Sequence, residues 1–149
     1  RKVIIYVAKG CPEQRRIALA NVGAIVEQIP TKTVRQGRTT DVAIDIKKID
    51  IQACLEHLGK QGYTSVLVEG GSTIISSFVE SLAFDKIVTY IGNLVIGGAN
   101  STSAVGGTGF ATLYEAPTLE FASSRILDNN IRVESYRSGR EGSYVYRHR

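Results

Sequence analysis

Apolar runs alternate with stretches of helical spacing along the first half of the chain. The apolar runs are rich in β-branched residues and predict buried strands over Lys2–Ala8, Ala24–Ile29 and Ser65–Val68. The helical spacing, with glycines as stops, predicts helices over Pro12–Asn21, Asp50–Gln61 and Thr73–Leu82. Alternating strands and helices are typical of a mostly parallel sheet with right-handed crossovers.

The pattern changes after residue 85, where strand-like runs follow one another without helices between them. These strands are predicted over Lys86–Ile91, Leu119–Leu127, Ile131–Tyr136 and Ser143–Tyr146. The run Asp128-Asn129-Asn130 is a hairpin-turn signal. We therefore expect one α/β domain over residues 1–149, with helices flanking a mostly parallel central sheet and antiparallel C-terminal strands along one edge.

Two connections differ from the rest of the chain in composition. Pro30–Asp41 is polar, carries Lys32, Arg35 and Arg38, and is predicted to be an exposed loop. Gly97–Gly109 is long and rich in glycine, and long connections inside a domain commonly serve function or move.

The composition limits the classes of protein to consider. The 149 residues are 43% hydrophobic and 21% charged, which is typical of a globular protein in solution. No apolar run reaches the ~18–20 residues of a membrane-spanning helix, so we expect no membrane partner. Two scattered cysteines indicate a reducing, cytoplasmic setting, and together with two histidines they offer no metal-ligand spacing.

The positive charge is concentrated at the C-terminus. The net charge is +4, and residues 137–149 carry +3 of it, so a basic tail follows a nearly neutral body. Tyr136, Tyr144 and Tyr146 interleave with arginines there, a pattern that fits single-stranded nucleic acid or, at least as well, an edge strand blunted by charge. Because the charge is local, we expect no nucleic-acid partner.

The clearest local motif is Glu69-Gly70-Gly71-Ser72-Thr73, where a predicted buried strand gives way to a helix. The two glycines let the backbone approach a ligand closely, and either hydroxyl is able to cap the helix. Free amides at the positive end of a helix suit a phosphate or diphosphate, and ligands of open α/β sheets bind at the carboxyl ends of strands. A simple strand-to-helix turn fits the two glycines equally well.

A carboxylate and a second glycine pair have two interpretations each. Glu69 accepts hydrogen bonds either from neighbouring backbone amides or from a polar substrate. Gly97 and Gly98 mark either a turn or bulge, or a wall that a cofactor approaches closely. The residues alone leave these alternatives open.

Several segments resemble the riboflavin-biosynthesis reductase family, which includes the C-terminal reductase domain of the bacterial deaminase–reductase and stand-alone archaeal and fungal reductases. The resemblance runs from about residue 2 to residue 136. The segments that carry it are Leu67–Thr73, Ser76–Phe78, Phe84–Ile87, Tyr90–Ile91, Ile96–Gly98 and Gly107–Phe110. The last of these is more similar to the stand-alone archaeal type.

The resemblance implies a dihydrofolate-reductase-like fold, NADPH as hydride donor and a homodimer, for which the late antiparallel strands are a reasonable surface. The implied substrate is a pyrimidine with a 5-phosphoribosylamino group, which is reduced to its ribitylamino form. Glu69 matches the family's substrate-contacting acid, and no residue is assigned a catalytic role. The residues that match the cofactor-binding stretch are Gly70, Gly71, Ser72, Thr73, Ile74, Ile75, Ser76 and Ser77, with the pair Gly97 and Gly98 in addition.

Other features bear on this resemblance. The cations of the Pro30–Asp41 segment either reach the 2′-phosphate of NADPH or, as we favour, are exposed charge. Family members usually carry, ahead of the position that matches Arg1, a strand with a Ser-x-Asp-Gly-like motif and a helix with basic residues that help to hold the substrate. This sequence has neither, and its lack of methionine favours a fragment. Alternatives are a catalytically degenerate nucleotide-binding or assembly module of the same fold, and a pterin or folate reductase.

Overall fold

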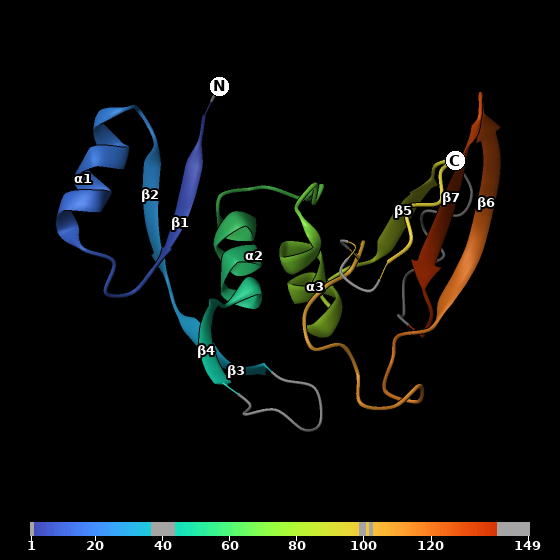
Figure 1. Ribbon diagram of the computed structural model, residues 1–149. Coiled ribbons are helices and arrows are strands. Elements are labelled where there is room, and N and C mark those ends of the chain that lie inside the picture. The colour runs from blue at the N-terminus through green and yellow to red at the C-terminus, as the bar shows by residue number, and fades with distance from the viewer. Residues whose placement is uncertain (1, 37–43, 99–100, 102, 140–149) are drawn as a thin grey trace. The chain divides into compact units, whose positions relative to one another are not determined.

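The computed structural model describes residues 2–36, 44–98, 101 and 103–139, and Figure 1 labels its helices and strands. The chain divides into two compact units, Arg1–Val68 and Glu69–Arg149, and each contains both strands and helices. The α/β class predicted from the sequence is therefore confirmed. None of the helices in the described part of the chain has the length and apolar character that a bilayer crossing requires.

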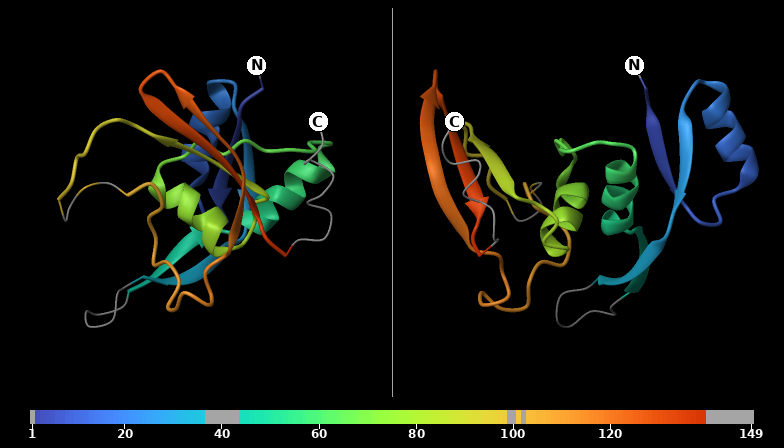
Figure 2. Two further views of the ribbon diagram at one scale, coloured as in Figure 1. Left: turned by 90° about the vertical axis from the view of Figure 1, so that its right-hand side faces the viewer. Right: turned by 180° about the vertical axis from the view of Figure 1, so that it is seen from behind.

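A parallel strand pair with its connecting helix begins the first unit. β1 (Ile4–Ala8) and β2 (Ile25–Ile29) run in parallel, and α1 (Glu13–Asn21) connects them. The helix lies beside β2 (Figures 1 and 2). Gly23 adopts a φ of +89° just beyond α1, where an amino acid with a side chain would be strained. The first two predicted strands, the helix and its glycine stop are confirmed.

A hairpin that the sequence did not predict follows β2. β3 (Thr31–Gln36) and β4 (Ile44–Ile49) pair antiparallel, with Val34 opposite Ile46. The predicted loop is therefore wrong over residues 31–36. The polar composition of the segment suggested a loop, but a strand of a two-stranded ribbon is also polar because much of its surface lies in water. The strand that pairs with it lies outside the segment, so the segment alone gave no sign of the pairing. Arg38 and the side chain of Arg35 fall outside the described residues.

An aspartate caps the second helix and binds a lysine of the hairpin. α2 (Ile51–Lys60) follows Asp50, whose Oδ1 accepts hydrogen bonds from the amides of Gln52 at 3.0 Å and Ala53 at 3.4 Å. Lys32 Nζ lies 3.0 Å from the same oxygen. Burial disfavours the charged carboxylate, but the hydrogen bonds from Lys32 and the two amides outweigh it and lower the pKa of Asp50. The predicted helix is confirmed, and Lys32 is held by its N-cap.

Replacing Asp50 with alanine should lower the free energy of unfolding by about 1 kcal/mol, because two amides at the start of α2 lose their acceptor. Asparagine keeps an accepting oxygen and should recover most of this loss. Because the pKa of Asp50 is lowered in the folded chain, its contribution is complete above about pH 4 and disappears as acid protonates it. Urea unfolding at several pH values measures both effects. An asparagine variant as unstable as the alanine variant would contradict the assignment to capping.

His57 joins α2 to both strands of the parallel pair. Its Nδ1 lies 3.0 Å from the hydroxyl of Tyr6 on β1, and its Nε2 lies 3.8 Å from a carboxylate oxygen of Glu27 on β2. Burial and the neighbouring Cys54 and Glu27 raise the pKa of Tyr6. Cys54, on the same helix, is 8% exposed, so this face of α2 belongs to the core of the first unit.

The third predicted strand, Ser65–Val68, is not a strand in the structure. The segment belongs to none of the described sheets, and Val66 and Leu67 are 45% and 80% exposed. Apolar, β-branched composition creates a tendency to extend, but a strand also needs a neighbour for its amides and carbonyls. Among the described residues no segment supplies one.

The second unit begins with a helix and continues in an antiparallel sheet. α3 (Ser72–Glu80) confirms the predicted helix with slightly shifted ends. The sheet has the order β5-β7-β6, and its strands are β5 (Lys86–Ile91), β6 (Leu119–Leu127) and β7 (Asn130–Arg137). The hairpin between β6 and β7 turns at Asp128, which has a φ of +51°. These antiparallel strands and the turn are confirmed, whereas the predicted strand Ser143–Tyr146 lies outside the described residues.

Candidate functional site

The first turn of α3 leaves its backbone amides without a side-chain cap. Gly71 is the N-cap, in an extended conformation (φ −68°, ψ 172°), and no side chain of the described residues accepts a hydrogen bond there. Its carbonyl accepts hydrogen bonds from the amides of Ile74 at 3.0 Å and Ile75 at 3.1 Å, as at the start of a regular helix. The first turn contains no acidic residue. The positive end of the helix is therefore available to an anion.

The two glycines ahead of the helix differ in what surrounds them. A Cβ at Gly70 would lie 2.6 Å from the Cβ of Ile74, so a side chain there would force the turn apart. A Cβ at Gly71 would meet nothing within 4 Å. Gly70 is thus required by packing within the turn, while Gly71 borders open space directly in front of the free amides. A diphosphate group fits this place, because there is open space beside Gly71, the amides of the first turn are uncapped, and the first turn contains no acidic residue that would repel it.

Glu69 immediately precedes this turn and is exposed. Within the described part of the chain, no hydrogen bond or ion pair holds its carboxylate. Among the described residues, Glu69 therefore does not accept hydrogen bonds from neighbouring backbone amides. Its carboxylate is available to a ligand.

The hydroxyl groups of α3 separate into two sets. Ser76 is fully buried, and its hydroxyl donates to the carbonyl of Thr73 at 2.9 Å. The hydroxyl of Ser77 donates to the same carbonyl at 2.9 Å. Thr73 itself is exposed. Of the predicted cofactor-binding hydroxyls, that of Thr73 is thus open to a ligand, whereas that of Ser76 is covered.

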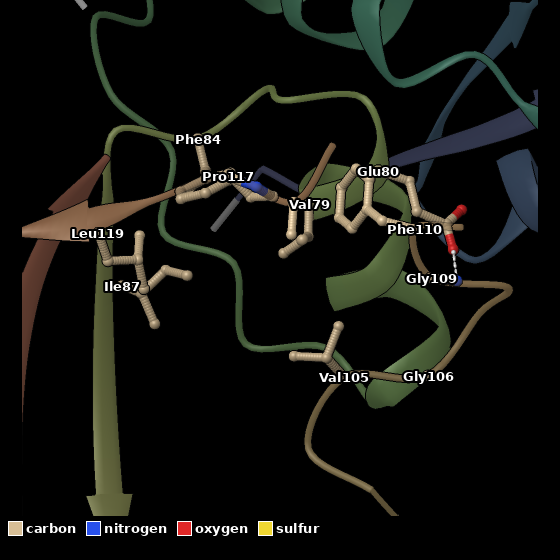
Figure 3. Close-up of a pocket in the computed structure, with 11 residues that line it drawn as sticks. Val79, Glu80, Phe84, Ile87, Val105, Gly106, Gly109, Phe110, Pro117 and Leu119 are labelled. Carbon is tan, nitrogen blue, oxygen red and sulfur yellow. Dashed lines mark hydrogen bonds between the residues drawn. The ribbon is translucent and has the colours of Figure 1, made fainter. Parts of the chain in front are cut away.

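A glycine-rich loop, residues 103–109, contacts one side of α3 and is anchored by a residue that the sequence did not reveal. The amide of Gly106 donates to the carbonyl of Ser72 at 3.1 Å. Glu80 Oε1 accepts a hydrogen bond from the amide of Thr108 at 2.9 Å. It accepts a second from the amide of Gly109 at 3.2 Å (Figure 3). The signal was present in the spacing, because Ser72, Ser76 and Glu80 recur every four residues and therefore lie on one side of the helix.

An apolar pocket of about 340 Å³ lies where the end of α3, the start of β5 and this loop meet (Figure 3). Its lining includes Val79, Phe84, Ile87, Val105, Phe110 and Leu119. The pocket has few polar groups, so it offers a diphosphate nothing comparable to the amides at the start of α3.

Gly97 and Gly98 lie on the exposed segment after β5 and have φ values of +63° and +91°. A Cβ on either would meet nothing within 4 Å. The carbonyl of Gly98 accepts hydrogen bonds from the amide and the hydroxyl of Ser101. Their assignment to the cofactor site stays a prediction, because the interactions among the described residues do not connect them with the start of α3.

Comparison with known structures defines the class of this domain. Two structures of RibD from Acinetobacter baumannii, forms 2 and 1, match it with a TM-score of 0.63, at 21% and 20% sequence identity. The matches cover 89% and 90% of this chain and 31% of each RibD chain. The chain therefore has the α/β, dihydrofolate-reductase-like fold found in RibD. The model of the RibD C-terminal domain family matches residues 1–133, and the chain belongs to this family.

Relatives with assigned names are similar over part of their length. The riboflavin biosynthesis protein RibD of Bacillus amyloliquefaciens is 32% identical over 107 residues, which are 71% of this chain and 29% of that protein. The 2,5-diamino-6-ribosylamino-4(3H)-pyrimidinone 5′-phosphate reductase of Archaeoglobus fulgidus is 33% identical over 89 residues, which are 58% of this chain and 41% of that protein. The chain thus spans less than half the length of either relative.

Proposed function

We propose that this chain is an NADPH-dependent reductase of riboflavin biosynthesis. Its substrate is a 5-phosphoribosylamino-pyrimidine, and the ribosyl group is reduced to its ribitylamino form. Membership of the RibD C-terminal domain family and the name of the archaeal reductase relative support this assignment. The observation that carries it for this chain is the uncapped start of α3 beside two glycines.

The start of α3 is proposed to hold the diphosphate of NADPH. The amides of Ser72 and Thr73 donate to its oxygens, the hydroxyl of Thr73 adds a further donor, and the positive end of the helix favours the negative charge. Ile74 and Ile75 offer apolar surface beside this turn, and the buried Ser76 and the loop over it keep the helix in place.

Glu69 is proposed to hold the substrate. Its carboxylate accepts hydrogen bonds from donors on the pyrimidine or the sugar chain and so fixes the position of C1′. When bound, NADPH supplies a hydride to C1′ of the ring-opened, imine-like form of the sugar, and a proton completes the amine. The residues of this chain position the two partners, whereas the cofactor carries the redox chemistry.

Two measurements test the proposed function. NADPH fluorescence during titration with the protein reports cofactor binding, and loss of NADPH absorbance after adding the deaminated or the non-deaminated pyrimidine phosphate reports turnover. Binding with turnover of either pyrimidine is expected. Binding without turnover of either would reject the reductase assignment in favour of a nucleotide-binding module.

Replacing Gly71 with aspartate should weaken NADPH binding by about tenfold or more. The carboxylate of the aspartate would occupy the open space beside Gly71 and accept hydrogen bonds from the amides of the first turn. Its negative charge would also repel the diphosphate. Folding should survive, because aspartate is a good N-cap and the φ of Gly71 suits any residue. Asparagine is the matched control, since it caps equally well without charge and should weaken binding less. If aspartate and asparagine bind NADPH as tightly as glycine does, the diphosphate lies elsewhere.

The proposed reductase is a homodimer in the cytoplasm that acts on a small molecule. Neither a membrane nor a nucleic acid is part of the proposal.

A further inference from the structure

The loop of residues 103–109 is bonded to the peptide group that links Ser72 to Thr73. The amide of Gly106 donates to the carbonyl of Ser72 at 3.1 Å. That carbonyl and the amide of Thr73 are the two ends of one planar peptide group. The proposed function assigns the amide of Thr73 to the diphosphate of NADPH. The loop therefore contacts a ligand-binding peptide group from its opposite end.

A hydrogen bond to a carbonyl strengthens the amide of the same peptide group as a donor. The carbonyl draws electron density from the nitrogen, and each such bond strengthens the next by ~10–30%. The peptide group after Thr73 is supported from within α3, since the hydroxyls of Ser76 and Ser77 each donate to the carbonyl of Thr73 at 2.9 Å. The peptide group between Ser72 and Thr73 is supported by the loop. Its strength as a donor therefore depends on whether the loop stays on the helix.

One side chain at the far end of α3 holds the loop there. Glu80 is the last residue of the helix, and its carboxylate accepts hydrogen bonds from the amides of Thr108 and Gly109 (Figure 3). The loop also lies close to the first turn, because a Cβ on Gly106 would be 3.1 Å from the hydroxyl of Ser72. The two ends of α3 are thus connected through the loop as well as through the helix.

We propose that Glu80 is a positioning residue for the cofactor site and that it sets the affinity of the first turn of α3 for NADPH by holding the loop on the helix. The inference rests on the proposed function and deepens it by naming what regulates the cofactor site. Coupling between two sites is reciprocal, so NADPH at the first turn should in turn hold the loop more firmly on α3.

The charge of Glu80 separates this proposal from simple electrostatics. Glu80 lies about 12 Å along the helix from Ser72, where a carboxylate repels an anion only weakly. Removal of the charge alone should therefore leave NADPH binding unchanged or tighten it. Release of the loop has the opposite effect, because it takes a hydrogen bond away from the carbonyl of Ser72. The sign of the change in affinity distinguishes the two causes.

NADPH fluorescence titration of two variants measures that sign. Glu80→Ala should raise the dissociation constant of NADPH by about fivefold or more, because the loop loses its acceptor. Glu80→Gln keeps a carbonyl oxygen for the same two amides and should bind NADPH within about twofold of the wild type. Glu115→Ala is the matched control and should change nothing. It removes an exposed carboxylate that accepts the amide of Ala111 at 3.3 Å, within its own segment.

Amide hydrogen exchange of the wild type tests the reciprocal effect and does not depend on how the variants fold. Saturating NADPH should slow the exchange of the Gly106 and Thr108 amides by a factor similar to the loss of affinity in Glu80→Ala. The amides of Asp128 and Asn129, in the turn between β6 and β7, should exchange as before.

Three results would overturn the proposal while NADPH still binds to the wild type. They are an alanine variant with the affinity of the wild type or higher, a glutamine variant as weak as the alanine variant, and loop amides that exchange equally fast with and without NADPH. Failure of the wild type itself to bind NADPH would instead reject the proposed function, and the inference with it.

Discussion

Replacing Glu69 with glutamine is expected to reduce turnover by about 30-fold or more while leaving NADPH affinity unchanged. A hydrogen bond to a charged group contributes ~1.5–3 kcal/mol, and the amide accepts only weakly in place of the carboxylate. The residue precedes the turn that we propose to hold the diphosphate, so cofactor binding should not depend on it. Steady-state turnover together with NADPH fluorescence titration measures both quantities.

The matched control for this variant is Glu56→Gln, which removes an exposed carboxylate from α2. It should leave turnover and NADPH affinity as they are. If Glu69→Gln abolished NADPH binding, the proposed role of Glu69 in holding the substrate would be wrong, and the residue would belong to the cofactor site.

Replacing Gly107 with alanine is expected to lower the free energy of unfolding of the second unit by about 3 kcal/mol. Gly107 has a φ of +77°, which costs ~1 kcal/mol for a residue with a side chain. A Cβ at this position would also lie 2.7 Å from the hydroxyl of Ser76 and would strike the carboxylate of Glu80. Relieving that overlap requires the loop to leave α3, at a cost of ~1–3 kcal/mol.

Gly109 in the same loop provides the comparison. Its φ of +71° is nearly the same, but a Cβ there would meet nothing within 4 Å. Gly109→Ala should therefore cost only the ~1 kcal/mol of backbone strain. Urea unfolding measures the free energy of unfolding of both variants. The difference between the two values reports the contact between the loop and the helix. Equal destabilisation would mean that the loop is not docked on Ser76 and Glu80.

The elements that the sequence predicted correctly are those whose signals are local. Asp50 identified the start of α2 because a cap acts on the amides that directly follow it, and Gly23 identified the stop after α1 for a similar reason. The elements predicted wrongly depend on a partner elsewhere in the chain. Thr31–Gln36 became a strand because Ile44–Ile49 pairs with it, and Ser65–Val68 did not form a strand because no described segment pairs with it.

The candidate site follows the same division. The motif from Glu69 to Thr73 was visible because the turn and its helix are contiguous in sequence, and the structure places an uncapped helix start there. The anchor at Glu80 was not visible, since it acts on amides of a loop that follows 28 residues later. Sequence spacing alone does not reveal which side of a helix a distant loop will cover.

The attachment of the loop anchored by Glu80 also affects how well ordered the first turn of α3 is before a ligand binds. A helix of nine residues is marginal on its own in water, so its order depends on what packs against it. The carboxylate of Glu80 and the carbonyl of Ser72 tether the loop at both ends of the same helix. A ligand at the first turn therefore meets amides that are already aligned, and the entropy of ordering them is lost during folding, ahead of association.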